Sequence, residues 1–395
     1  MYEQLARRKH ALFVYFFIPG LALATWVTRT PAIRDGIEAS IAQMGLVLLG
    51  LSIGSMTGVL GAGRLVGRHG TRWTSLLGLW LVLVSLLTMG LGTVLGQQLI
   101  VAMGLAFFGL GMGCAEIAIN IDGAEVERQS GEPVLHTLHG CFSLGTLVGA
   151  LLGYVLSNGG VHVAWHLGAV AFLIIPMIVR FWKHIPEGTG RAGQSPQTAE
   201  AADRPANVWN DPRVLLIGLI VFAMALSEGA ANDWLPILMV DEHGFSQASG
   251  SLIFVAFAAA MTIVRFGGGQ LLRRFGRVTV MRLCACLGAL GIAFVVFGSH
   301  PALAAAAVFL WGIGASLGFP VALSAAGDGG EGAAERVKAV AIIGYVAMLV
   351  GPPMLGFLGE AHGLRSAMLL VLALVLVAAV IAPALRTHVT PPPRF

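Results

Sequence analysis

Residues 63–70 read Gly-Arg-Leu-Val-Gly-Arg-His-Gly, and residues 269–276 read Gly-Gln-Leu-Leu-Arg-Arg-Phe-Gly. The two stretches share the frame Gly-x-Leu-x-x-Arg-x-Gly, lie 206 residues apart, and each follows the second long apolar run of its half. Self-similarity at equivalent positions indicates an internal repeat. We therefore expect two copies of one structural unit, each with the same loop motif; its glycines and arginines are Gly63, Arg68, Gly70, Gly269, Arg274 and Gly276.

The chain around these stretches has the composition of a membrane protein. Of its 395 residues 56% are apolar and 11% charged, and the mean hydropathy is +0.82. Soluble domains carry about a quarter charged residues, and a membrane-spanning helix needs about 20 apolar residues. These numbers exclude a disordered chain, a collagen and a nucleic-acid-binding module. The apolar runs predict an all-α membrane protein with twelve transmembrane helices, at 10–30, 41–62, 74–95, 98–124, 133–157, 163–182, 213–240, 247–267, 279–298, 302–325, 336–358 and 364–385.

One long polar segment divides the chain. Residues 183–211 are rich in Gly, Pro, Ser and Ala, a composition typical of a flexible linker. We expect a six-helix half at 1–182, a cytoplasmic linker at 183–211 and a second six-helix half at 212–395. Two halves in the same orientation predict parallel repeats, with the binding site at their interface.

The positive charges are distributed unevenly along the predicted topology. With both termini inside, only Arg29, Arg34 and Arg365 fall on the outer side, and the other 21 of the 24 Lys and Arg residues fall on the cytoplasmic side. This is the bias that the positive-inside rule predicts. The net charge of +4 therefore has a membrane explanation and gives no reason to expect a nucleic-acid partner.

Two carboxylates lie within the predicted membrane helices. Glu228 is close to the middle of its helix and shares a face with Asn232, and Glu116 shares a face with Asn120. An ionisable side chain at the bilayer centre costs about 2.5–3.5 kcal/mol on insertion scales, and such groups usually mark substrate pathways or proton relays. We expect these four residues to bind substrate or protons. The alternative is that each carboxylate holds helices together through backbone or hydroxyl groups.

Further side chains are candidates for the same site. His139 lies at a depth similar to that of Glu116 on the following helix, where the two could share a proton. Trp26 and Trp234 would supply aromatic walls. Asp233 and Arg29 lie nearer the helix ends; a structural role is an alternative for both, and the long Arg29 side chain can reach water.

Other patterns predict packing rather than chemistry. Glycines at 50, 54 and 58 and at 145, 149 and 153 form stripes that let membrane helices approach closely. His162 and His166 are spaced as a metal pair but have no third ligand nearby in the sequence, and no phosphate-binding loop is present. We expect no metal, no cofactor and no enzymatic activity, so that energy comes from a gradient or transport is passive.

The repeated frame resembles the loop signature of the major facilitator superfamily, Gly-x-x-x-Asp-Arg-x-Gly-Arg-Arg, although Gly67 and Arg273 stand in place of its Asp. This resemblance implies that the loop motif of each half takes part in gating. The stretches 26–31 (WVTRTP), 115–120 (AEIAIN), 139–145 (HGCFSLG) and 228–234 (EGAANDW) look like the bacterial YbjJ and MosC-like branch of that family. The stretch 115–120 is also similar to a segment of fucose and hexose proton symporters. That resemblance implies a role for Glu116 in sugar binding and proton coupling.

Taken with the charges inside the helices, the resemblance predicts a secondary active transporter of the bacterial inner membrane. We expect a monomer that moves a small polar solute, such as a sugar, polyol or amino-polyol, in symport with protons by alternating access. Proton-driven export of drugs or metabolites is the first alternative. Exporters of this superfamily typically carry Gly-Pro in helix 5, where this chain has Gly149-Ala150. A membrane receptor or lipid-handling enzyme that does not transport is the second alternative.

Overall fold

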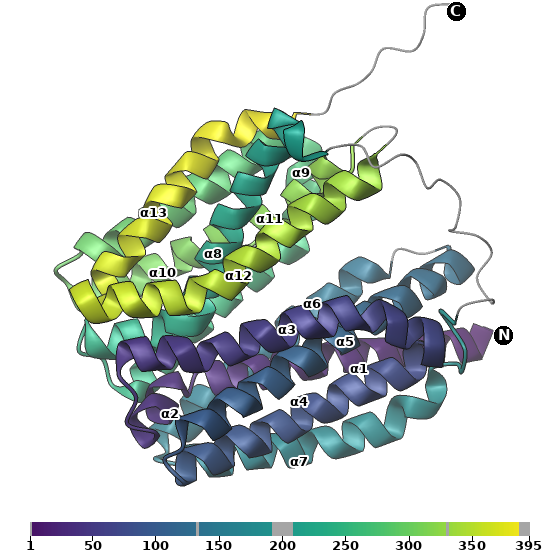
Figure 1. Cartoon of the computed structure of the whole chain (residues 1–395), viewed down its shortest axis with the longest axis horizontal. Coiled ribbons are helices and arrows are strands. Elements are labelled where there is room, and N and C mark those ends of the chain that lie inside the picture. The colour runs from purple at the N-terminus through teal and green to yellow at the C-terminus, as the bar shows by residue number, and fades with distance from the viewer. Residues whose placement is uncertain (1, 132–133, 192–207, 329–331, 387–395) are drawn as a thin grey trace, which may run out of the picture. The chain divides into compact units, whose positions relative to one another are not determined.

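The computed structural model describes residues 2–131, 134–191, 208–328 and 332–386, and within them the chain is built from α-helices (Figure 1). The helices are α1 (Tyr2–Val27), α2 (Thr30–Gly36), α3 (Ile41–His69), α4 (Thr71–Val94), α5 (Gln98–Ser130), α6 (Leu135–Asn158), α7 (Val163–Phe181), α8 (Pro212–Asp241), α9 (Gln247–Phe297), α10 (Pro301–Ala315), α11 (Gly318–Ala326), α12 (Ala333–His362) and α13 (Leu364–Ile381).

The described residues contain eleven helices that are long and apolar enough to cross a membrane. One of them, the 51-residue α9, is interrupted by the non-helical residue Gly276 and supplies two crossings. The short helices α10 and α11 together form a single candidate span. The fold is thus an all-α membrane fold with twelve crossings, and the expected fold class is confirmed.

Several helices extend beyond the predicted apolar runs. The first helix begins at Tyr2 rather than at residue 10, and α5 continues to Ser130 rather than ending at 124. Backbone hydrogen bonding continues past the point where hydropathy falls, because a helix end in water or at the membrane surface tolerates charged side chains. Most of the predicted linker, residues 192–207, lies outside the described residues.

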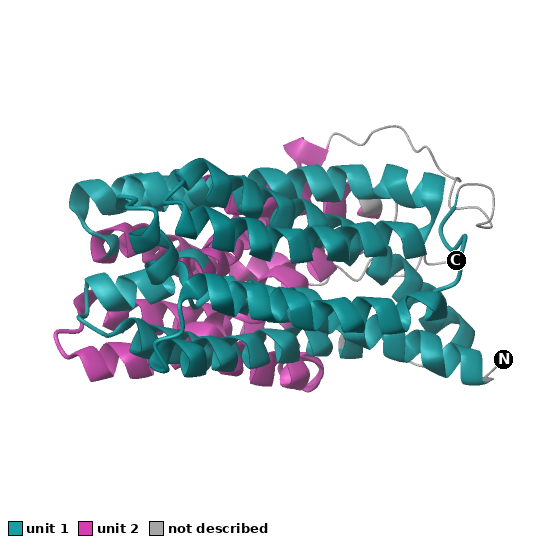
Figure 2. Ribbon diagram, turned by 90° about the horizontal axis from the view of Figure 1, so that it is seen from below, with its two compact units in different colours: residues 1–198, 233–258, 352–364 teal, residues 199–232, 259–351, 365–395 magenta. Residues whose placement is uncertain are grey.

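Packing groups the chain into two compact units (Figure 2). Unit 1 comprises residues 1–198, 233–258 and 352–364, and unit 2 comprises residues 199–232, 259–351 and 365–395. Unit 1 therefore includes the second part of α8, the first part of α9 and the last part of α12. The division of the sequence at residues 183–211 into two six-helix halves stays a prediction about the repeat.

Glycine stripes bring the helices of unit 1 together. The α5 helix packs against both α3 and α4, and α1 packs against α6 (Figure 1). A methyl group at Gly54 of α3 would overlap the Ala106 carbonyl of α5, and one at Gly145 of α6 would overlap the Phe17 carbonyl of α1. The predicted packing role of both stripes is therefore confirmed, since only glycine permits these backbone approaches.

The last glycine of each loop motif has an unusual backbone conformation. Gly70 has φ 85° and ψ 169°, and Gly276 has φ 74° and ψ 163°, a region open essentially to glycine alone. The chain turns at both points between consecutive membrane crossings. Gly63 and Gly269 are helical, and the side chains of Arg68 and Arg274 are exposed. The final glycine of each motif therefore has a structural role at a turn, and a gating role for the motif stays a prediction.

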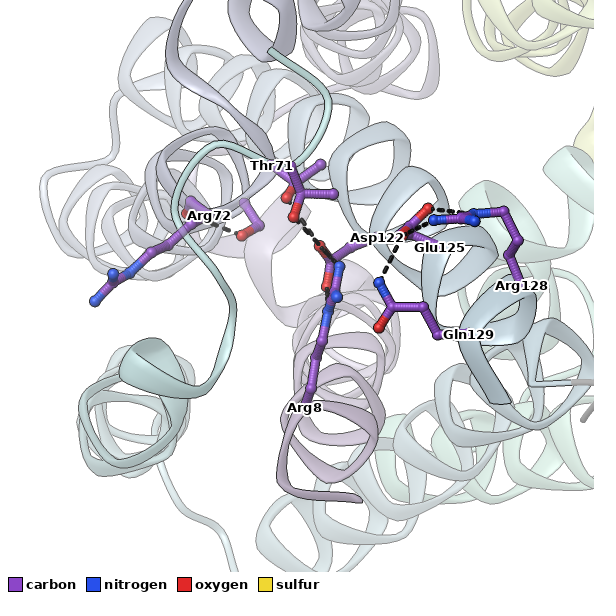
Figure 3. Close-up of polar contacts among 9 residues, drawn as sticks. Arg8, Thr71, Arg72, Asp122, Glu125, Arg128 and Gln129 are labelled. Carbon is purple, nitrogen blue, oxygen red and sulfur yellow. Dashed lines mark hydrogen bonds and ion pairs between the residues drawn. The ribbon is translucent and has the colours of Figure 1, made fainter. Parts of the chain in front are cut away.

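A buried carboxylate lies beside the Gly70 turn. Asp122 of α5 accepts hydrogen bonds from Arg8 Nε at 3.0 Å and Arg8 Nη2 at 2.7 Å, and a third from Thr71 Oγ1 at 3.0 Å (Figure 3). Arg8 also donates to Thr189 Oγ1 at 3.3 Å. The side chains of Asp122 and Arg8 are only 1% and 6% exposed. We call Arg8, Thr71, Asp122 and Thr189 the Asp122 cluster; it joins α1, α4, α5 and the segment after α7.

Unit 2 contains a counterpart, which we call the Asp328 cluster. Asp328 accepts from Arg277 Nη1 at 2.5 Å and lies 3.9 Å from Arg213 Nη2, while Arg336 Nη2 donates to the Asp328 backbone carbonyl at 2.9 Å. Asp328 follows Asp122 by 206 residues, the offset that also separates Gly276 from Gly70 and Arg277 from Thr71. The sequence repeat is thus accompanied by a repeated, carboxylate-centred contact.

Candidate functional site

The side chain of Glu228 in α8 is paired with a cation. Arg265 Nη2 of α9 donates to Glu228 Oε1 at 2.8 Å, and both residues belong to unit 2. The side chains are 18% and 27% exposed, so the ion pair is only partly shielded. Both residues lie within membrane-spanning segments. The Glu228 carboxylate thus has the counter-charge that a carboxylate within a membrane-spanning helix needs.

Arg265 also contacts a break in a membrane-spanning helix. Its Nε donates to the Ser316 carbonyl at 3.3 Å, between the end of α10 at Ala315 and the start of α11 at Gly318. A helix interruption frees carbonyl groups that must find other partners, and broken helices are typical of transporter binding sites. A methyl group at Gly318 would overlap Met224 of α8. The break therefore packs against both helices that carry the ion pair.

A buried hydrogen bond is made by the residue next to Glu228 in the Glu228–Arg265 ion pair. Trp311 Nε1 of α10 donates to Ser227 Oγ at 2.9 Å, and both side chains are buried. Ser227 directly precedes Glu228, so this bond fixes α8 against α10 at the level of the carboxylate. Asn232, one turn after Glu228, is partly exposed on the same face of α8. Glu228, Asn232, Arg265 and Ser316 form a candidate polar site in unit 2.

The predicted site residues of unit 1 fall into two groups. The side chain of Glu116 is exposed and that of Asn120 is partly exposed, although both lie in the membrane-spanning part of α5. His139 of α6 is exposed as well and packs edge to face against Phe16 of α1, with ring centroids 5.1 Å apart. The side chains of these three residues are thus at least partly exposed, as those of binding groups must be.

The second group is buried within unit 1. Trp26 and Trp234 are 1% and 0% exposed, and Asp233 is 6% exposed. Trp26 packs edge to face against Phe108 at a centroid distance of 6.0 Å. Arg29 is only 4% exposed, so the expectation that its side chain reaches water is wrong. Its Nη2 donates to the Val161 carbonyl, so the side chain is directed toward the connection between α6 and α7.

Sequence reasoning missed Arg265 and Ser316. Arg265 stands near the end of the predicted helix 247–267 and counts among the predicted cytoplasmic charges, whereas α9 remains helical for ten residues beyond it, up to Phe275. At 1.5 Å per residue, Arg265 lies about 16 Å before the non-helical Gly276. The available signal was the position of Gly276 in the repeated frame, which marks the true end of that crossing. Within the described ranges, no three His, Cys, Asp or Glu side chains gather as a metal site would require.

A separate polar contact in unit 1 joins residues far apart in the sequence. Arg34 of α2 pairs with Asp35 at 2.8 Å and with Asp241 at the end of α8, and Gln247 Nε2 donates to Asp35 Oδ2 at 3.1 Å. Burial opposes the charge of Arg34, but hydrogen bonds from Arg34 to Asp241 and Asp35 raise the pKa of its guanidinium overall. Ser251 Oγ of α9 donates to the Thr28 carbonyl at 2.8 Å. These contacts explain why parts of α8 and α9 belong to unit 1.

The chain was compared with known proteins. The family model of the Major Facilitator Superfamily matches residues 11–344. The uncharacterised transporter y4wD of Sinorhizobium fredii is 30% identical over 376 residues, covering 94% of this chain and 96% of that protein. Membrane protein MosC of Rhizobium meliloti is 26% identical over 366 residues, covering 92% and 86%.

Solved structures share the fold. A mutant of the nucleoside transporter NupG aligns with a TM-score of 0.78 at 13% identity, covering 96% of this chain and 99% of that one. The E. coli fucose:proton symporter FucP aligns with a TM-score of 0.65 at 16% identity, covering 96% and 98%. The relatives are named as transporters and not as enzymes. Because the family model spans most of its membrane crossings, this multi-pass membrane protein belongs to the Major Facilitator Superfamily.

Proposed function

We propose that the protein is a proton-coupled secondary transporter of a small polar solute, and that Glu228, Arg265 and the break after α10 form part of its binding site. The observation that carries this proposal is a partly exposed ion pair within membrane-spanning helices, attached to a broken helix. A purely structural pair in a protein interior would be expected to be fully enclosed by its neighbours, as the Asp122 cluster is.

The chemistry of the pair suits coupled transport. A carboxylate that can be approached by water can exchange its contact with Arg265 for a proton, and the released guanidinium then offers donors to solute hydroxyl groups. Protonation and solute binding thereby become linked, because both change the partner of the same carboxylate. The relation is reciprocal: whatever affinity the proton adds for the solute, the solute adds for the proton.

Glu116 and Asn120 supply a second set of polar groups in α5. A carboxylate in contact with lipid would be unfavourable by about 2.5–3.5 kcal/mol, so the exposed Glu116 side chain is expected to face water rather than lipid. We propose that these residues, with His139, contribute to solute or proton binding. The names of the structural relatives support a sugar-like solute, since one is a nucleoside transporter and another a fucose:proton symporter.

The proposed cellular setting follows from the charge distribution and the bacterial relatives. We place the protein in the inner membrane as a monomer, with both termini and the linker in the cytoplasm, working by alternating access. Sugars, polyols and amino-polyols are the preferred solutes because the candidate groups are carboxylates, amides and one guanidinium, which pair with hydroxyl and amino groups.

The test begins with a thermal-shift screen of the purified protein against fucose, ribose, xylitol, glucosamine and the lipophilic cation ethidium. A ligand that binds the folded state raises the apparent melting temperature. The stabilising solute is then supplied to proteoliposomes with an imposed pH gradient. We expect uphill accumulation by the wild type, and its loss in Glu228→Gln and Glu116→Gln with solute exchange partly retained.

The matched control is Glu125→Gln, which removes a carboxylate from α5 that pairs with the exposed Arg128. This variant should accumulate solute as the wild type does. Stabilisation by ethidium alone would favour the drug-export alternative. Normal uphill accumulation by Glu228→Gln would remove the ion pair from the coupling mechanism.

A further inference from the structure

A buried guanidinium in unit 1 has no counter-charge among the described residues. Arg29 is 4% exposed, and its Nη2 donates to the Val161 carbonyl in the connection between α6 and α7. Within the described part of the chain, its Nε and Nη1 have no hydrogen-bond acceptor, and no carboxylate forms an ion pair with it. These two nitrogens carry three N–H bonds. Burial lowers the pKa of this guanidinium from its ordinary value, because the charged form is deprived of water.

A second unsatisfied group lies on the chain segment that follows Val161. His166 of α7 is 0% exposed, and among the described residues neither its Nδ1 nor its Nε2 has a hydrogen-bond partner. Its position is set by the chain segment that Arg29 contacts, since the His166 backbone N–H donates to the His162 carbonyl at 3.2 Å, directly after Val161. The charge of Arg29 acts electrostatically on the His166 ring. Histidine thus contributes two further orphaned nitrogens at the same end of α7.

The Arg29 guanidinium and the His166 imidazole both lack the partners that buried polar groups normally have. Most buried polar groups in proteins are hydrogen-bonded, and each exception needs an explanation. A buried charge is tolerated when it is paired, whereas here a buried guanidinium and a buried imidazole that interact electrostatically each leave two nitrogens without a partner. Arg34, five residues later, shows the usual solution, because Asp35 and Asp241 neutralise it.

We propose that Arg29 and His166 hold a small monovalent anion, of which chloride is the type, in a site that is separate from the solute site of unit 2. An anion supplies both the acceptor and the compensating charge, while a water molecule supplies only the acceptor. Helix α6 packs closely on the end of α1, since a methyl group at Gly153 would overlap the Thr28 side chain, the residue before Arg29. Close packing in this region favours a small occupant.

This inference is independent of solute transport. The bound anion stabilises the region where α1 ends and α7 begins, and its role is to neutralise Arg29 within unit 1. The proposed anion belongs to the halides or the smallest carboxylates. The effects of these two classes on protein stability can be compared directly. Gluconate, a much larger anion, serves as the reference.

The experiment measures the melting temperature of the purified protein at constant ionic strength while sodium gluconate is replaced by sodium chloride or sodium formate. We expect a saturable rise of about 5 °C with chloride, since an anion bound only by the folded state stabilises it by mass action. A larger rise with formate than with chloride would assign the site to a small carboxylate. Equal melting temperatures in chloride, formate and gluconate would overturn the proposal and leave water as the occupant.

Two variants locate the effect. Arg29→Gln should abolish the chloride dependence, and Arg34→Gln, a matched change at an arginine already neutralised by carboxylates, should retain it. An unchanged chloride response in Arg29→Gln would refute the assignment of the site. If Arg29→Gln does not fold, crystals of the wild type in bromide decide: an anomalous peak between Arg29 and His166 supports the site, and bromide bound only elsewhere overturns it.

Discussion

Replacing Asp122 by asparagine should destabilise the protein strongly, because it leaves Arg8 as an uncompensated buried charge. The wild-type pair has two hydrogen bonds of 3.0 and 2.7 Å, and its side chains are 6% and 1% exposed. Removing one partner of such a pair costs about 3–5 kcal/mol, since the remaining charge has lost its counter-charge but not its burial. Asparagine keeps an oxygen for Thr71, so the loss is mainly electrostatic.

The expected change can be measured as a melting temperature. One kcal/mol corresponds to about 2–4 °C for a unit of 150–250 residues, so Asp122→Asn should lower the melting temperature by roughly 6–20 °C. Glu125→Gln on the same helix removes an ion pair whose side chains are 27% and 72% exposed, and it should change melting by no more than about 2 °C (Figure 3).

A second variant tests the cause. In Arg8→Gln combined with Asp122→Asn, no buried charge remains, and about half of the lost stability should return. The reasoning fails if Asp122→Asn melts within about 2 °C of Glu125→Gln, or if the double variant is less stable than Asp122→Asn alone.

Three further expectations concern other parts of the chain. Gly70→Ala should cost about 1–3 kcal/mol because its φ of 85° excludes a side chain, whereas Gly63→Ala in an open helical position should be neutral or stabilising; melting temperatures in the reverse order would contradict this account. The raised pKa of Arg34 means that its pairing energy is fully present below the pKa of an unfolded arginine and is lost only as the pH rises past the folded pKa, so the effect of Arg34→Gln on melting should be constant between about pH 6 and 9. A cysteine at Gly160 should react with an impermeant thiol reagent added from the periplasm and one at Gly63 should not, and the opposite pattern would reverse the proposed topology.

The helices and the repeat could be predicted because their signals are local. Hydropathy identifies each apolar run, and the glycine that ends the repeated frame reports a backbone conformation that other residues rarely adopt, as Gly70 and Gly276 show. The stripe at Gly50, Gly54 and Gly58 likewise predicts close packing from spacing alone.

The partners of the charged residues could not be predicted in the same way. Asp122 and its partner Arg8 are 114 residues apart, and Glu228 and Arg265 are 37 apart, so neither pairing follows from helical periodicity. Arg29 donates to Val161, 132 residues away, so its burial does not follow from local hydropathy. The interruption between α10 and α11 does have a local signal, because Pro320 has no backbone N–H to donate to the Ser316 carbonyl four residues earlier. The contact of that carbonyl with Arg265 does not follow from this signal.

The 206-residue offset also shows what the two copies no longer share. Asp122 corresponds to Asp328, but Glu116 corresponds to Ala322 and Glu228 to Ala22, and Val59 stands where the second copy has Arg265. The aspartate at the centre of the Asp122 cluster and of the Asp328 cluster is present in both copies. Each charged group of the proposed pathway is present in one copy only. A chain built from two copies of the first half would thus keep a cluster centred on aspartate in each half, but it would lack the Glu228–Arg265 pair. New solute preferences can therefore be engineered at the unduplicated positions without disturbing the parts that hold each copy together.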